Sequence, residues 1–188
     1  MLDWLLSFDT ALYHLFNTDI ANPVFDWVMP YITNVRFWMP VYVLGLAALA
    51  IFGGRRGRVC TLVLLCGVLI SDSFNSRVVK ELVHRPRPFE TLHDARVIAP
   101  TAGGASFPSS HATNNFTAAF ILSAYYARRK WLWYFCAILV AFSRVYVGVH
   151  YPLDVLAGAV EGSLIAWMLV WLQTRAFSID DEHKEFTQ

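Results

Sequence analysis

Long apolar runs alternate with short polar stretches along most of this chain. Five of the runs are about as long as a membrane-crossing helix, at Phe37–Phe52, Val59–Val79, His111–Ala127, Trp131–Val147 and Pro152–Gln173. Some are short for a bilayer core of about 30 Å, and tryptophans near their ends, which favour the membrane–water boundary, extend them. The pattern predicts an all-α fold, a polytopic membrane helix bundle of about five to six spans.

The N-terminal segment follows a different pattern. Leu5, Phe8, Leu12 and Leu15 recur at helical spacing, whereas the polar residues fall elsewhere around the helix. Such a helix is amphipathic and too polar to span, so we expect it to lie in the membrane interface. Residues 24–34, after the break at Asn22–Pro23, form a second short helix, and the pattern does not decide whether it spans or lies on the membrane.

The composition agrees with a membrane protein and excludes several other classes. Of 188 residues, 56% are hydrophobic and 15% are charged, which is more apolar material than a soluble domain of this length easily buries. The net charge of +1, without a basic segment interleaved with aromatic residues, argues against nucleic-acid binding. The three cysteines lie inside predicted spans, where an odd number argues against a disulfide framework.

The basic residues between the spans predict an orientation. Gly54–Arg58 and Ala127–Lys130 are rich in arginine and lie on the same side of the predicted bundle. By the positive-inside rule that side is cytoplasmic. We therefore expect residues 1–178 to form one membrane-embedded domain and residues 179–188 to form a polar, mobile cytoplasmic tail.

Three polar motifs interrupt the apolar pattern, all on the predicted non-cytoplasmic face. The first is Lys80 with Arg87–Pro88 (K-x6-R-P), the second is P-S-S-H at 108–111, and the third is S-R-x5-H-x3-D at 143–154. Ionisable residues in or beside apolar helices are costly and mark functional sites. Together these motifs supply cations, imidazoles, hydroxyls and a carboxylate, a set suited to holding a phosphate group and attacking it.

The motifs resemble the signature of the type-2 phosphatidic-acid phosphatase superfamily, which also includes vanadium haloperoxidases and glucose-6-phosphatase. The resemblance covers Lys80–Asp154, and the predicted spans look like those of the lipid-phosphatase branch. One difference is Ser110, which stands where glycine often follows the first serine of the middle motif. The resemblance implies a membrane-bound lipid phosphatase.

The chemistry of the residues suggests three catalytic roles. His150 is the candidate nucleophile, because an imidazole nitrogen can attack phosphorus and form a phosphohistidine. Asp154 lies four residues later in the first turn of the last span and can accept the other ring N–H, which orients His150. His111 is the candidate general acid for the leaving group. By itself, a His–Asp pair at a helix start would be explained better as a helix cap, but beside Arg144 and His111 the catalytic interpretation is favoured.

Five further residues are candidates for binding the phosphate. Lys80, Arg87 and Arg144 would hold its non-bridging oxygens, since arginine offers a bidentate fork and lysine a point charge. Ser109 and Ser110, with the N–H groups that open the third span, add donors at the positive end of a helix dipole. Because these cations neutralise the phosphate, we expect no metal ion and no cofactor.

Other polar residues have less specific interpretations. Asp72 and Glu161 are candidates for supporting the phosphate site, or for hydrogen bonds between helices. Arg77 and Arg85 fall outside the motif positions and are interpreted as flanking cations at the membrane boundary. The outer loop is interpreted mainly as solvated; a second phosphate of the substrate is an alternative contact for some of its basic residues, His84, Arg85, His93 and Arg96.

The small size and simple topology resemble bacterial undecaprenyl-diphosphate phosphatases of the cell membrane, with the active site facing the periplasm or outside. Lipid A 1-phosphatases and phosphatidylglycerophosphate or phosphatidate phosphatases share the motifs and are the alternatives. A vanadate-dependent haloperoxidase and a non-catalytic lipid-phosphate binder are more distant ones. The expected partners are the lipid substrate and the membrane, without an obligatory protein partner. Because the motifs contact only the phosphoryl group, the lipid, the choice between monophosphate and diphosphate, and the oligomeric state stay open.

Overall fold

A computed structural model of the chain describes residues 2–101 and 103–185. Its elements, in order, are α1 (Leu2–His14), η1 (Leu15–Asp19), α2 (Pro23–Thr33), α3 (Val35–Phe52), α4 (Gly54–Phe74), η2 (Asn75–Val79), α5 (Lys80–Val83), α6 (Pro88–Thr91), α7 (Ser110–Tyr125), η3 (Ala127–Arg129), α8 (Lys130–Tyr146) and α9 (Pro152–Glu185). Every regular element within these ranges is helical, which confirms the all-α prediction.

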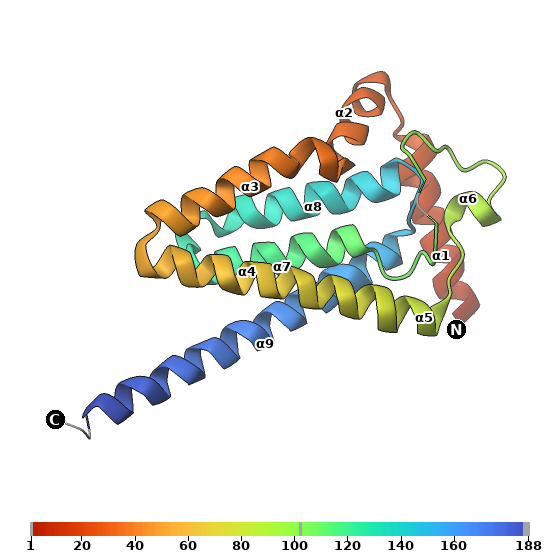
Figure 1. Cartoon of the computed structure of the whole chain (residues 1–188). Coiled ribbons are helices and arrows are strands. Elements are labelled where there is room, and N and C mark those ends of the chain that lie inside the picture. The colour runs from red at the N-terminus through yellow and green to blue at the C-terminus, as the bar shows by residue number, and fades with distance from the viewer. Residues whose placement is uncertain (1, 102, 186–188) are drawn as a thin grey trace.

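The five predicted spans correspond to α3, α4 with η2, α7, α8 and α9. By length and composition, three stretches of the described chain are suited to crossing a membrane, namely Val35–Phe52, Gly54–Thr91 and Pro152–Ala176. The helices α7 and α8 are shorter, with 16 and 17 residues. In Figure 1, α3, α4, α7 and α8 run side by side and α9 crosses them obliquely.

The helix α7 is the centre of the bundle and packs against α4, α8 and α9. Two glycines of α9 allow its backbone to approach α7 closely. A Cβ atom added at Gly158 would lie 2.6 Å from the carbonyl oxygen of Ser109, and one at Gly162 would lie 2.2 Å from that of Thr113. These contacts fix the N-terminus of α7, which carries the second motif, against the first turns of α9.

The helix α1 crosses the end of the bundle near α5 and α6 (Figure 1). Its extension η1 is held by Asn17, whose buried side chain donates to the carbonyl oxygens of Arg96 and Tyr146, both at 2.8 Å, and accepts from the N–H of Arg96 at 2.9 Å. The following helix α2 is capped by Asn22, whose side chain accepts from the N–H of Phe25 at 3.0 Å. The N-terminal segment is therefore attached to the bundle through buried hydrogen bonds.

The predicted tail, residues 179–188, lies partly outside the described residues. The helix α9 continues to Glu185, so its backbone includes residues 179–185, while residues 186–188 are not described.

Candidate active site

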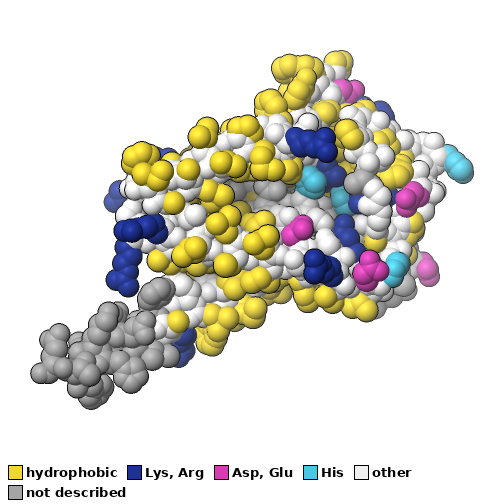
Figure 2. Space-filling view, viewed as in Figure 1, with side chains coloured by type: hydrophobic (Ala, Val, Ile, Leu, Met, Phe, Trp, Pro, Cys, Tyr) yellow, Lys and Arg dark blue, Asp and Glu magenta, His cyan; other side chains and the backbone are white. Residues whose placement is uncertain are grey.

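The three motifs meet at the end of the bundle that α1 crosses. Arg87, Arg144 and His150 are buried there, with 3%, 6% and 2% of their surface exposed. Figure 2 shows histidine, lysine and arginine side chains gathered around a hollow on this part of the molecule, while hydrophobic side chains cover much of the rest. The fold thus brings together residues that are up to 74 positions apart in the sequence (Lys80 to Asp154).

His150 lies in the turn between α8 and α9, and its ring has a charged neighbour on each side. Nδ1 is 3.6 Å from Oδ2 of Asp154, and Nε2 is 3.3 Å from Nη1 of Arg87. Asp154 is in the first turn of α9 and accepts the N–H of Tyr151 at 2.8 Å, which fixes its carboxylate. Burial lowers the pKa of His150 to about 4, so the imidazole keeps a free lone pair at neutral pH.

The three predicted phosphate-binding cations are held mainly by uncharged groups. Lys80 Nζ donates to the carbonyl oxygen of Ala105 at 3.2 Å, and Arg87 Nε donates to that of Gly104 at 3.0 Å. Arg144 donates through Nη1 to the hydroxyl of Thr33, at the end of α2. Because carbonyl and hydroxyl oxygens orient these side chains without neutralising them, their positive charge is available to an anion.

The second motif supplies donors at the start of α7. Ser109 is fully buried, its N–H donates to the carbonyl oxygen of Asp154 at 2.9 Å, and its hydroxyl is without a hydrogen-bond partner in the described structure. The Nε atom of Arg144 is a second buried donor of this kind. His111 follows in the first turn of α7, within electrostatic reach of Arg144 and His150. Unpaired buried donors of this type suit the oxygens of a phosphoryl group.

Ser110 points toward α4 instead, and a π-helical segment explains how. The segment η2 starts at Asn75, which accepts the hydroxyl of Ser110 at 2.9 Å. Residues five apart differ by roughly 140° around a regular α-helix, whereas a π turn brings them back to nearly the same side. Asn75 and Lys80 are five apart, so η2 directs both toward the site.

The two acidic residues predicted to support the site differ in their surroundings. Glu161 accepts from Asn75 Nδ2 at 2.8 Å and from the hydroxyl of Thr113 at 3.1 Å, which links it through Asn75 to Ser110. Asp72 accepts from Asn114 Nδ2 at 2.9 Å on a more exposed part of α4. Glu161 is therefore one hydrogen bond further from the second motif than Asn75, and Asp72 bridges α4 and α7.

Comparison with known proteins bears on this arrangement. Residues 61–178 match the PAP2 superfamily. The chain belongs to the PAP2 superfamily. One relative matches beyond these residues. The chain is 29% identical over 181 residues to the lipid A 4'-phosphatase of Bacteroides thetaiotaomicron, and the match covers 92% of this chain and 80% of the relative.

Two more comparisons support the same family. An undecaprenyl-diphosphatase of Sulfolobus acidocaldarius is 36% identical over 140 residues, which cover 73% of this chain and 64% of the relative. The PAP2 fold seen here is similar to that of Aquifex aeolicus LpxE, with a TM-score of 0.70 and 25% identity over 86% of this chain and 93% of that one. The chain is accordingly an integral membrane PAP2 phosphatase, a phosphoric-ester hydrolase whose family context agrees with metal-independent chemistry.

One sequence interpretation is wrong. Arg85 does not flank the PAP2 site as a boundary cation: only 16% of its side chain is exposed, and its guanidinium lies between two carboxylates. Nη1 donates to Oδ1 of Asp154 and Nη2 donates to Oδ2 of Asp9, both at 2.7 Å. Arg85 stands two residues before Arg87 in the repeat R-P-R-P, but the repeat itself does not indicate the two carboxylate partners.

Two residues of the PAP2 site carried no sequence signal. Ser106 is fully buried, and its hydroxyl donates to Oδ2 of Asp154 at 2.5 Å and lies 3.4 Å from Nδ1 of His150. Asp9, from α1, is also fully buried. Burial raises the pKa of Asp9, and the hydrogen bond from Arg85 opposes that rise and favours the ionised carboxylate.

Proposed function

We propose that this PAP2 phosphatase removes a phosphate from a lipid through a phosphohistidine formed on His150, with undecaprenyl diphosphate as the substrate. The observation that carries the proposal is the position of the His150 ring. Its Nδ1 faces the carboxylate of Asp154, and its Nε2 faces the Arg87 guanidinium, which would hold a phosphoryl oxygen. The nitrogen beside the phosphate-binding cation is thus the one that keeps its lone pair.

The first chemical step forms the phosphohistidine. Nε2 of His150 attacks the terminal phosphorus, and the bond from phosphorus to the bridging oxygen breaks. The bridging oxygen leaves with its electron pair and takes a proton from His111. Asp154 stabilises the positive charge that develops on the imidazole, since its carboxylate faces the Nδ1–H.

The second step returns the enzyme to its starting state. Water attacks the phosphorus of the phosphohistidine, His111 takes the water proton, and the nitrogen–phosphorus bond breaks to release inorganic phosphate. Lys80, Arg87 and Arg144 bear the charge on the phosphoryl oxygens in both steps, and the hydroxyl of Ser109 adds a neutral donor. In this proposal the fixed cations supply the positive charge, and neither step uses a metal ion.

The choice of lipid rests on the activity named for a relative and on the position of the site at the end of the helix bundle. A relative of 36% identity is an undecaprenyl-diphosphatase, and a long prenyl chain can stay in the bilayer while its diphosphate reaches the end of the bundle. The charge bias of the connecting segments supports a site on the periplasmic or outer side of a bacterial cell membrane. Lipid A is the second candidate, because the relative with the longest match reported above is a lipid A 4'-phosphatase.

A phosphate-release panel tests the substrate. Purified protein in detergent, without added metal, is given undecaprenyl diphosphate, lipid A, phosphatidylglycerophosphate and phosphatidate at equal surface concentration. We expect the highest kcat/KM on undecaprenyl diphosphate. Equal values on all four lipids would contradict the choice of substrate, and a highest value on lipid A would favour the second candidate.

Trapping the intermediate tests the mechanism. Substrate labelled with ³²P in its terminal phosphate is mixed with enzyme and quenched in alkali, in which a phosphohistidine survives. Wild-type protein should retain label and His150→Ala should not. His111→Ala should lose far more activity on an alkyl phosphate than on a nitrophenyl phosphate, because the nitrophenolate leaves without a proton. Label retained by His150→Ala would place the nucleophile elsewhere.

A further inference from the structure

Arg85 connects the N-terminal helix to the carboxylate beside His150. One nitrogen of its guanidinium binds Asp154 on α9 and the other binds Asp9 on α1, each at 2.7 Å. Both carboxylates are fully buried. A guanidinium shared between two buried carboxylates leaves this group of three with one net negative charge, and its fork geometry fixes both partners.

Further contacts fix the arrangement from both ends. The other oxygen of Asp9, Oδ1, accepts the N–H of Leu153 at 2.8 Å, so α1 also holds the first turn of α9. The guanidinium of Arg85 lies 4.0 Å from the ring centroid of Tyr151. Its carbonyl oxygen accepts the N–H of Ser106 at 2.7 Å, and Ser106 in turn binds Asp154. Arg85 therefore reaches Asp154 through its side chain and through its backbone.

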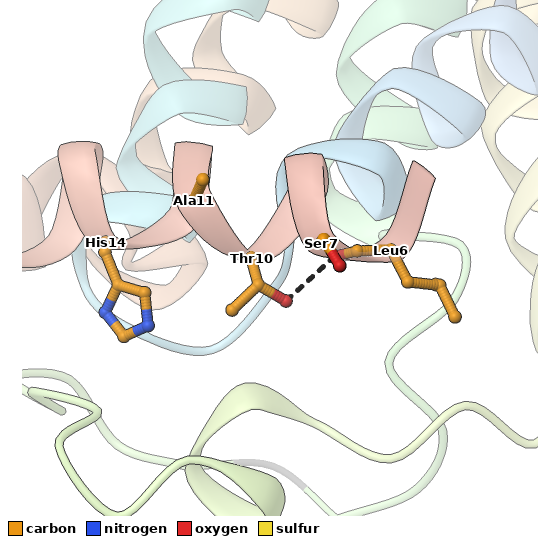
Figure 3. Close-up of a pocket in the computed structure, with 5 residues that line it drawn as sticks. All are labelled: Leu6, Ser7, Thr10, Ala11 and His14. Atoms are coloured by element: carbon orange, nitrogen blue, oxygen red, sulfur yellow. Dashed lines mark hydrogen bonds between the residues drawn. The ribbon is translucent and has the colours of Figure 1, made fainter. Parts of the chain in front are cut away.

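Only one face of α1 takes part. Asp9 and Tyr13 are fully buried on it. A neighbouring face borders a shallow, open surface depression of about 470 Å³, lined by Leu6, Ser7, Thr10, Ala11 and His14 and shown in Figure 3. The hydroxyls there make local contacts, such as the bond from the Thr10 hydroxyl to the carbonyl oxygen of Leu6 at 2.9 Å, and His14 lies 3.5 Å from the exposed carboxylate of Asp94. Asp9 therefore provides the charged contact from α1 to Arg85, and Tyr13 packs against Tyr151 with ring centroids 5.5 Å apart.

We infer that Asp9 and Arg85 are positioning residues for the reaction proposed above, which hold Asp154 in place and set the charge next to His150. The inference rests on the proposed function of His150. In this arrangement Asp9 restrains Arg85, Arg85 restrains Asp154, and Asp154 orients the imidazole. The interfacial helix α1 is then part of the catalytic apparatus although it carries no group that contacts substrate.

The inference predicts opposite effects of the two charges on the pH profile. Arg85→Gln removes a positive charge near Asp154, so the His150–Asp154 pair takes up a proton at higher pH. Asp9→Asn removes a negative charge, so the same pair takes up a proton at lower pH. The other charged groups that face the His150–Asp154 pair, namely Lys80, Arg87 and Arg144 with His111 nearby, are unchanged in both variants. A loss of packing alone would not give shifts of opposite sign.

The experiment measures kcat and KM against pH for full-length protein with undecaprenyl diphosphate. We expect kcat to fall about 100-fold in Arg85→Gln and about 10-fold in Asp9→Asn, with KM within about threefold, because the change affects orientation rather than binding. The acid midpoint of kcat should rise by about one pH unit in Arg85→Gln and fall in Asp9→Asn. Ionisation of the substrate is common to all variants and cancels from the comparison.

Matched controls come from α1, which carries Asp9, and from η2, which lies shortly before Arg85 in the chain. Asp3→Asn changes an exposed aspartate of α1, and Arg77→Gln changes an exposed arginine of η2. Both should keep wild-type kcat and midpoint. Arg85→Lys keeps the charge without the fork, so its midpoint should stay near wild type while kcat falls. A folded fraction that is constant over the pH range does not move the midpoint, so circular dichroism at each pH is measured alongside, and partly misfolded variants with a constant signal still report on the inference.

The outcomes separate this inference from the proposed function. If wild-type protein is active, His150→Ala is not, and both Asp9→Asn and Arg85→Gln resemble their controls, the inference is wrong and the proposed function stands. Midpoints that move in the same direction in the two variants also overturn it. If His150→Ala is as active as wild type, the proposed function itself has failed.

Discussion

Ser106 donates its hydroxyl to Oδ2 of Asp154 over 2.5 Å, from a loop position 48 residues earlier in the chain. The same carboxylate oxygen accepts the N–H of Tyr151 and faces Nδ1 of His150. The loop before α7 therefore helps to hold Asp154 through Ser106, together with Tyr151 and Arg85. The loop belongs to the site as much as the motif residues do.

Ser106→Ala tests this role. Loss of one buried donor to a carboxylate should lower kcat about tenfold, equivalent to about 1.4 kcal/mol, because Asp154 is held less firmly. KM should change little, because the Ser106 side chain does not contact the charged groups of Lys80, Arg87 or Arg144, which are predicted to bind the phosphate. The control is Ser163→Ala, whose hydroxyl donates to the carbonyl oxygen of Ala159 within α9. Equal effects of the two substitutions would show that Ser106 has no special part.

Metal removal should leave the activity unchanged. Lys80, Arg87 and Arg144 converge on the site and supply the charge that a divalent cation would otherwise provide. Phosphate release is measured after dialysis against EDTA and again after addition of Mg²⁺ or Zn²⁺. Rates within about twofold of each other are expected. A rate that collapses with EDTA and returns with one metal would refute the cation-based mechanism.

Asn17→Ala should destabilise the protein through α1 and η1. The substitution leaves the carbonyl oxygens of Arg96 and Tyr146 and the N–H of Arg96 without their partner. We expect a loss of about 3 kcal/mol in the free energy of unfolding, from several buried polar groups left unpaired. Thermal unfolding in detergent measures it. Thr10→Ala, on the flank of the same helix, is the control and should have a much smaller effect.

His150 makes stability depend on pH. Its pKa of about 4 in the folded protein lies below the value of about 6.5 expected in the unfolded chain. The unfolded chain therefore binds a proton first, and this contribution destabilises the fold as the pH falls from about 6.5 to about 4, by on the order of 3 kcal/mol in total. Above that window the contribution is constant.

The matching measurement is the difference in melting temperature between wild type and His150→Gln across this pH range. The variant should lose less stability toward acid than wild type, because glutamine does not titrate. Parallel curves would mean that His150 is protonated as readily in the fold as in the unfolded chain.

The sequence was sufficient for the helices and for the motif residues, and the reason is physical. Apolar runs of helical length and the ionisable residues beside them can both be read from the sequence. The helices α3, α7 and α8 accordingly begin and end within two residues of their predicted limits, whereas α4 begins five residues earlier and α9 continues to Glu185. The role of Asp9 could not be predicted from the sequence, because a lone aspartate on an amphipathic helix is ordinarily assigned to the solvated face. Its burial depends on Arg85, 76 residues away, and pairing between distant residues leaves no local pattern.

The partner of Asp9, Arg85, could not be placed from the local sequence either. A cation at the end of a span is ordinarily explained by the membrane boundary, and nothing in its neighbours indicates two buried carboxylate partners. The position of Ser110 depended on a similar hidden feature, since its partner Asn75 faces α7 only because the helix widens there. Local propensity does not predict a π turn of this kind.

The widened turn at η2 has a consequence for substitutions, insertions and deletions in this segment. Since Asn75 and Lys80 share a side only because the five-residue segment makes one broad turn, their alignment depends on the number of residues between them more than on which residues these are. Exposed positions such as Arg77 and Val78 can therefore vary in identity. A single deletion or insertion there would turn Lys80 away from the side of the helix that Asn75 occupies, so the length of this stretch constrains the site more than its exposed side chains do.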